Sequence, residues 1–197
     1  LLRRAGQLLQ EAGCKRDGGT LRLPNGQAFT IEFLDFDPSL QPHAGGLVKN
    51  LKLLGIDATM RTVDPAQYQK RTDEFDFDIT MRNMGSSLTP GDSLRSIYGS
   101  ESARRNGGRN LAGIQEPAVD ALIEVIGRAK NREELTIACR ALDRVLRSTR
   151  SMIPAWHNDS AWMAYWDLFG KPERPPRFAA TSSFMGAVAG TWWYDQE

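Results

Sequence analysis

The first half of the chain alternates between two hydrophobic periods, one typical of helices and one typical of strands. Leu1 to Gly13 places apolar residues three to four positions apart and ends in glycine, which predicts an opening helix. Similar spacing predicts helices at residues 40–54 and after Asp64-Pro65, whereas alternation predicts strands at 29–33, 56–63 and 75–81. This order of strands and helices implies parallel pairing with right-handed crossovers. The pattern therefore predicts an α/β fold, with ligands bound beyond the carboxyl ends of the strands.

Helical patterns dominate the second half of the chain. Residues 82–116 are rich in Gly, Ser, Asn and Arg around one short helix, for which Thr89 is the expected N-cap and Pro90 the first residue. Two amphipathic helices follow, opened by Pro117 and by Asn131, and we expect both to cover the sheet. Beyond residue 150 we expect short extended segments, a proline-stiffened linker and a tryptophan-rich tail.

Composition narrows the class of protein. The 197 residues are 41% hydrophobic and carry a formal net charge of +1, which predicts no general attraction to nucleic acid or anionic membranes. No apolar run approaches the roughly 20 residues that cross a bilayer. Cys14 and Cys139 match no metal or redox spacing, and buried thiols are favoured over a disulfide. With two histidines, neither a metal site nor a cofactor is expected.

Two polar patterns carry candidate chemistry. Asp76 and Asp78 lie on one face of the third predicted strand; they could share a proton, but the polar side of a half-buried strand is the favoured interpretation. The loop from Gly85 to Gly91 enters the short helix, where free backbone amides favour an anion such as a carboxylate. An N-cap that only ends the loop is equally compatible with this sequence.

Two other classes of function stay open. Ser86 and Ser87 do not fit the G-x-S-x-G elbow, but a serine hydrolase that pairs one of them with His157 is an alternative. A scaffold that binds protein through exposed tryptophans is another. Turnover that is lost with Ser86→Ala or His157→Ala would favour the hydrolase, and concentration-dependent association through the tail would favour the scaffold.

Many short segments occur in an order known from one family. They are Leu8-Leu9-Gln10-Glu11-Ala12-Gly13, Leu51-Lys52-Leu53-Leu54-Gly55-Ile56, Val63-Asp64-Pro65-Ala66-Gln67-Tyr68, Phe75-Asp76-Phe77-Asp78, Pro90-Gly91, Asn110-Leu111-Ala112-Gly113-Ile114, Pro117-Ala118-Val119-Asp120 and Ile153-Pro154-Ala155-Trp156. Together they resemble the C-terminal part of the peptide, dipeptide and nickel family of solute-binding proteins that serve ABC importers. The oligopeptide and microcin C uptake branch is the most similar.

This resemblance implies one lobe of a two-lobed, type II periplasmic-binding-protein-like fold, with a mixed sheet flanked by helices. Residues 1–157 would form most of the C-terminal ligand-binding lobe, and residues 158–197 would return to an N-terminal lobe that this chain lacks. The chain, which opens inside a helix without an initiator methionine, would be a fragment of an exported, periplasmic protein. Its partners would be a peptide-like solute and a membrane permease, and the fragment's tail is expected to be poorly covered or to pair with a second copy.

The resemblance also implies which residues face the ligand. None is expected to be catalytic, and the expected ligand-binding residues are Arg82, Asn83, Met84, Ser86, Ser87, Thr89, Asn110, Trp156 and His157. Peptide-binding members often carry an aspartate before the loop's proline, which anchors the free amino terminus of the ligand. The matching stretch here, residues 84–87, has no acid, so the resemblance does not extend to that contact.

Overall fold

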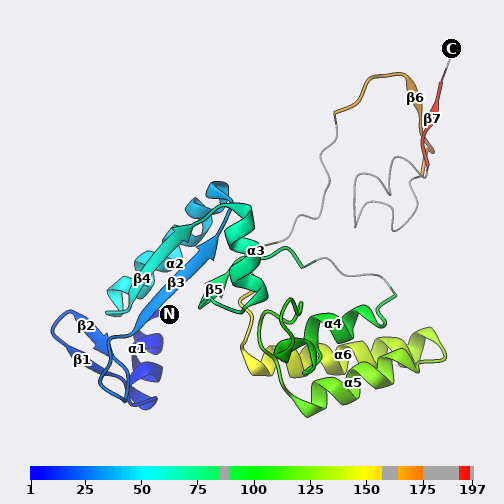
Figure 1. Cartoon of the computed structure of the whole chain (residues 1–197). Helices are drawn as coiled ribbons and strands as arrows, with labels where there is room; N and C mark the ends of the chain where they lie inside the picture. The colour runs from blue at the N-terminus through cyan, green and yellow to red at the C-terminus, as the bar shows by residue number, and fades with distance from the viewer. Residues whose placement is uncertain (85–88, 157–163, 175–190, 196–197) are drawn as a thin grey trace. The chain divides into compact units, whose positions relative to one another are not determined.

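The computed structural model describes residues 1–84, 89–156, 164–174 and 191–195 (Figure 1). It contains two compact units. The first unit comprises residues 1–83 and 104–111, and the second comprises residues 84–103 and 112–197.

A parallel sheet forms the centre of the first unit. The strands β3 (Thr30–Asp35), β4 (Asp57–Thr62) and β5 (Ile79–Thr80) lie in the order β4-β3-β5. The register pairs Thr30 with Asp57 at one end of β3 and Asp35 with Thr62 at the other. The predicted parallel pairing is therefore confirmed, and antiparallel pairing among the described residues occurs in separate two-stranded ladders.

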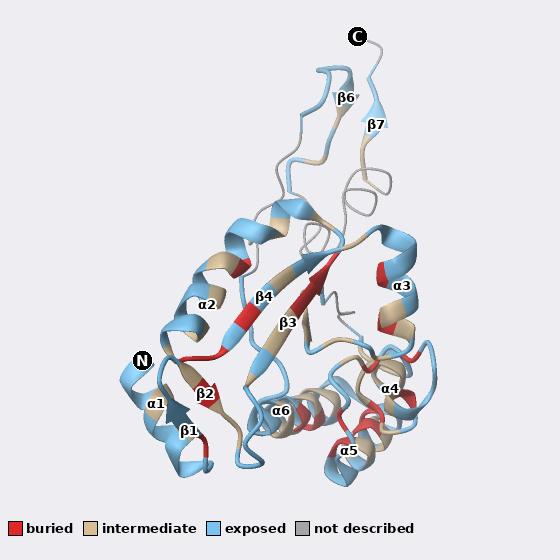
Figure 2. Ribbon diagram, turned by 60° about the vertical axis from the view of Figure 1, so that its left-hand side comes forward, coloured by how far each residue is buried: buried red, intermediate tan, exposed pale blue. Residues whose placement is uncertain are grey.

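Two helices cover the faces of this sheet. α2 (Gln41–Leu53) connects β3 to β4 and α3 (Pro65–Asp73) connects β4 to β5; they lie on opposite faces (Figure 2). The predicted N-cap of α3 is confirmed, because the Asp64 carboxylate accepts hydrogen bonds from the amides of Ala66 and Gln67.

The third strand is shorter than the sequence pattern predicts. Only Ile79 and Thr80 pair with β3, so the prediction of a strand from residue 75 is wrong for residues 75–78. Phe75 has a left-handed backbone with φ of 56°, which breaks the extended conformation. Asp76 and Asp78 are therefore not neighbours on a strand face. Asp76 pairs with Arg71 instead, and Asp78 accepts a hydrogen bond from the Glu32 amide.

A helix and a hairpin complete the first unit. α1 (Leu2–Glu11) confirms the predicted opening helix and is followed by the antiparallel strands β1 (Lys15–Asp17) and β2 (Thr20–Arg22). Cys14, Leu21 and Ile56 form a buried cluster at this end of the unit. Cys14 and Cys139 are both free thiols.

In the described part of the second unit the α-helices are α4 (Ser93–Tyr98), α5 (Pro117–Gly127) and α6 (Arg132–Thr149). The predicted cap of α6 is confirmed, since the Asn131 side chain accepts from the Glu134 amide at 2.9 Å. The buried residues of α5 and α6, such as Val119 and Leu142, pack on one another and on α4. We expected the apolar faces of α5 and α6 to pack on the sheet. This expectation is wrong for the buried residues of these faces, which pack within the second unit.

The short helix α4 begins later than expected. Asp92, not Thr89, is its N-cap, and Thr89 and Pro90 lie outside it. Thr89 and Asp92 are both good capping residues, so the sequence did not distinguish between them. The predicted anion site at the Thr89 helix start is wrong, because no helix begins there.

The last described segments are β6 (Phe169–Gly170) and β7 (Trp193–Tyr194), which pair antiparallel. The lobe boundary at residue 157 stays a prediction, since residues 157–163 lie outside the described part of the chain. Among the helices that the structure describes, none has the length and apolar character needed to cross a bilayer.

Candidate functional site

The carboxyl ends of the three parallel strands define one edge of the first unit. Asp35 ends β3, Thr62 ends β4, and Arg82 and Asn83 follow β5. The chain leaves β3 through α2 and leaves β4 through α3, and these two helices lie on opposite faces of the sheet. Such an edge of an α/β sheet is the usual place for a ligand, and it is the candidate site here.

The predicted ligand-binding residues of the first unit have different surroundings. Arg82 and Asn83 are exposed just beyond β5, as a ligand-facing position requires. Asn110 is fully buried, so its side chain occupies a packing position in this structure.

The other predicted residues belong elsewhere. Met84, Thr89 and Trp156 are exposed residues of the second unit. Ser86, Ser87 and His157 lie outside the described residues, and with them the hydrolase alternative. Convergence of the nine residues on one ligand stays a prediction.

Asp35 is a feature of this edge that sequence reasoning missed. Its Oδ1 accepts hydrogen bonds from the amides of Phe36 at 2.7 Å and Asp37 at 3.2 Å. The residue is only 4% exposed, and its buried Oδ2 has no hydrogen-bond partner among the described residues. A buried carboxylate oxygen in this position is unusual, because buried polar atoms are nearly always paired.

The contacts of neighbouring residues place Asp35 on the α2 face of the sheet. Ile31 packs on the cluster of Cys14, Leu21 and Ile56, as Leu51 of α2 does, whereas Phe36 stacks on Tyr68 of α3 with ring centroids 4.8 Å apart. Side chains alternate along a strand, so Asp35 shares the face of Ile31. On that face Gln41, at the start of α2, donates to the Oγ1 of Thr62 at 3.0 Å. Asp35, Gln41 and Thr62 thus form a polar group where β3 and β4 end.

Hydrogen bonds and ion pairs on the opposite face fix β5 and the segment before it. The hydroxyls of Tyr68 and Thr80 lie 2.9 Å apart. Arg71 pairs with Glu32 through Nη1 and Oε1 at 2.8 Å, and with Asp76 through Nε and Oδ2 at 2.7 Å. Hydrogen bonding to Glu32 raises the pKa of Arg71 above its usual value. These contacts hold the end of β5, from which Arg82 and Asn83 extend.

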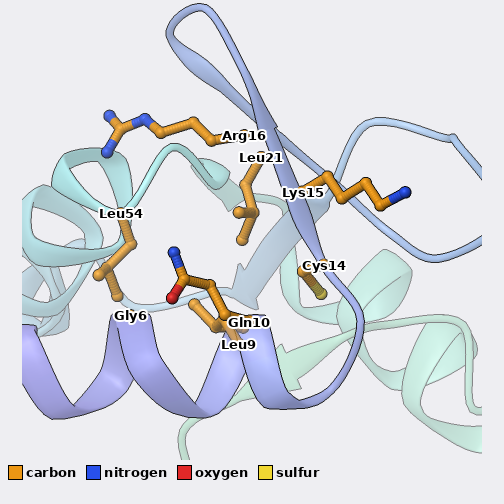
Figure 3. A pocket seen from close by; sticks show the side chains of 8 residues that line it. All are labelled: Gly6, Leu9, Gln10, Cys14, Lys15, Arg16, Leu21 and Leu54. Atoms are coloured by element: carbon orange, nitrogen blue, oxygen red, sulfur yellow. The ribbon is translucent and has the colours of Figure 1, made fainter.

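A pocket of about 500 Å³ lies at the opposite end of the unit, between α1 and the β1–β2 hairpin (Figure 3). It is lined by Gly6, Leu9, Gln10, Cys14, Lys15, Arg16, Leu21 and Leu54. Lys15 points away from the pocket, whereas Arg16 extends above it toward the side of Leu54 and the Gln10 amide points into the space between Leu54 and Leu21. The pocket is lined by both polar and apolar side chains and is remote from the carboxyl edge.

The described residues offer no metal-ligand set. No three His, Cys, Asp or Glu side chains within these ranges gather closely enough to hold an ion.

A sequence signal for Asp35 did exist. Asp37-Pro38 marked the end of β3, and residues at the carboxyl ends of parallel strands are candidates for ligand contact. Nothing in the sequence, however, indicated which carboxylate oxygen would be buried without a partner.

Comparison with known sequences gives a consistent result over almost the whole chain. The chain is 42% identical over 178 residues to an uncharacterized protein, y4wM, of Sinorhizobium fredii, covering 90% of this chain and 27% of that protein. It is 39% identical over 193 residues to a probable peptide-binding protein, YejA, of Agrobacterium fabrum, covering 98% of this chain and 30% of that protein. The chain thus spans less than a third of the length of these relatives.

Among solved structures, a periplasmic oligopeptide-binding protein of Thermotoga maritima with bound mannohexaose matches with a TM-score of 0.73. The match covers 100% of this chain and 40% of the other, at 16% identity. That likeness shows the fold alone, which is one lobe of a type II periplasmic binding protein, as the resemblance implied. The model of bacterial extracellular solute-binding proteins, family 5, matches residues 2–106. The chain belongs to this family of solute-binding proteins.

Proposed function

We propose that the full-length protein is the solute-binding component of an ABC importer and captures a peptide or peptide-like solute between two lobes. The observation that carries this proposal is membership of the family, over residues 2–106. The carboxyl edge of the sheet supports it, because exposed polar residues follow β5 there. Release of the solute to a membrane permease completes the proposed role, and no catalytic step is part of it.

A peptide is proposed as the solute because the Agrobacterium relative is named as a probable peptide-binding protein. The Thermotoga protein, named as oligopeptide-binding, was solved with mannohexaose bound, so a similar fold holds ligands of more than one chemistry. The solute class is therefore the part of the proposal that most needs a direct test.

The arrangement of lobes follows from the same proposal. Residues 1–157 form most of one lobe, residues 158–197 return to the other, and the remaining lobe belongs to the longer protein. Closure around the solute buries it between the lobes, which supplies most of the affinity. The proposed compartment is the periplasm, and self-association of the isolated chain through residues 158–197 is a proposed consequence of the missing lobe.

Native mass spectrometry of the full-length protein with a mixed oligopeptide library tests the function. We expect a retained peptide mass that disappears when residues 83–89 are replaced by a glycine-serine loop. The matched control replaces the exposed turn at residues 24–27, at the other end of the first unit, and should retain the peptide. No retained mass across the library would overturn the peptide proposal.

A further inference from the structure

The carboxylate of Asp35 is held in place by one oxygen and has the other available. Two backbone amides donate to Oδ1, from Phe36 at 2.7 Å and from Asp37 at 3.2 Å. Amide donors of this kind fix the orientation of a carboxylate. Oδ2 lies on the other side of the carboxylate, where it is buried without a partner among the described residues.

A buried, unpartnered carboxylate oxygen is costly to a folded protein. Its desolvation is not compensated by a hydrogen bond, and the cost is larger for a charged group than for a neutral one. The core does not need this charge, since Phe33, the buried residue before Asp35 on the same face of β3, is apolar. The position of Asp35 at the end of the central strand, where α/β folds bind ligands, suggests that its partner comes from outside the described residues.

We propose that Asp35 binds a positively charged group of the solute, an ammonium or a guanidinium. The inference rests on the proposed function and specifies the chemistry of the solute. Both groups carry several N–H donors and no acceptor, so they match a carboxylate oxygen that has no donor of its own. Gln41, whose amide nitrogen donates to Thr62, has a carbonyl oxygen that serves as a second acceptor for such a group.

The surroundings of Asp35 give such a group access. The chain that follows is largely at the surface: Phe36, Pro38, Ser39 and Gln41 are all exposed. The carboxylate thus lies just beneath the surface and not within the apolar core.

The test compares three peptide libraries on the full-length protein by native mass spectrometry. The first library is random pentapeptides, the second is the same library acetylated at the amino terminus, and the third is acetylated and also lacks Lys and Arg. We expect wild-type binding to fall about 10- to 100-fold for the library that has lost the recognised cation. The second library reports on the terminal ammonium and the third on side-chain cations, so the result also identifies the source.

Asp35→Asn removes the charge and keeps the shape. We expect it to weaken binding of the preferred library by the same factor and to abolish the difference between the libraries. Asp57→Asn, at the opposite end of the sheet, makes the same change in net charge and should bind like wild type. Without ligand, Asp35→Asn should unfold at the same temperature as wild type or higher, because it removes an uncompensated buried charge.

The outcomes separate the two proposals. A wild-type protein that retains no peptide overturns the proposed function, and this inference with it. Wild-type binding that is equal for all three libraries, or unchanged by Asp35→Asn, overturns only the inference. A lower unfolding temperature of Asp35→Asn, with an equal loss for every library, shows that Asp35 is a structural residue and also overturns it.

Discussion

Arg71 is the residue whose removal should most disturb the first unit without touching its apolar core. Its guanidinium joins the sheet, through Glu32 on β3, to the segment before β5, through Asp76. Arg71→Met keeps the aliphatic stem and removes both ion pairs. We expect the segment at residues 75–78 to loosen, because Phe75 holds a left-handed backbone that contacts with α3 must stabilise.

The magnitude follows from the exposure of each partner. The side chains of Arg71 and Glu32 are 19% and 28% exposed, so this pair lies between a surface pair, worth up to about 1 kcal/mol, and a buried one, whose rupture costs about 3–5 kcal/mol. Asp76 is 65% exposed, and its pair contributes less than about 1 kcal/mol. We therefore expect Arg71→Met to lower the free energy of unfolding by about 2 kcal/mol.

Urea unfolding followed by far-UV circular dichroism measures this change. Arg147→Met is the control, because Arg147 is 74% exposed and has one ion pair to Asp143 within α6; it should change the free energy by less than about 0.5 kcal/mol. A double-mutant cycle with Glu32→Gln should give a coupling energy of about 1 kcal/mol. A loss for Arg71→Met no larger than that of the control would refute the reasoning.

Two further predictions concern backbone space and pH. Gly55→Ala should lower the free energy of unfolding, measured in urea, by about 2 kcal/mol, since Gly55 has φ of +87° and a Cβ there would lie 3.0 Å from the Gly19 oxygen. The control is Gly127→Ala, whose Cβ would meet nothing within 4 Å and which should be neutral or stabilising. Burial raises the pKa of Tyr98 above its usual 10.0, so the Tyr98 hydroxyl of the unfolded chain loses its proton at a lower pH than that of the folded chain. The free energy of unfolding should therefore fall as pH rises past about 10, and it should fall less steeply in Tyr98→Phe.

The sequence predicts well those elements that depend on local chemistry. α2 begins and ends close to the expected residues, and α3 and α6 begin at the expected caps, because capping groups and hydrophobic spacing are local signals. The length of β5 is decided instead by contacts distant in sequence. The pair between Arg71 and Glu32 joins residues 39 positions apart, and no period in the sequence reports it.

The candidate site was predicted less completely than the fold. Its location at the carboxyl edge follows from strand order, and Arg82 and Asn83 are at that edge. Asn110 was expected to face the ligand because of the resemblance to the family; it is fully buried in this lobe, and its role in binding stays a prediction. Asp35 shows the opposite problem, since the burial of one oxygen depends on the three-dimensional arrangement of α2 and β4.

Each of the two units is built from two segments that are separated in the sequence, and this limits where the chain can be truncated. The chain passes from one unit to the other between residues 83 and 84, 103 and 104, and 111 and 112. A truncated product that stops at residue 83 would lack Gly107, whose amide donates to the Asp73 oxygen at the end of α3. Neither unit is formed by one uninterrupted segment of the chain. A truncation that keeps the whole first unit must therefore extend to residue 111 and include residues 84–103 of the second unit.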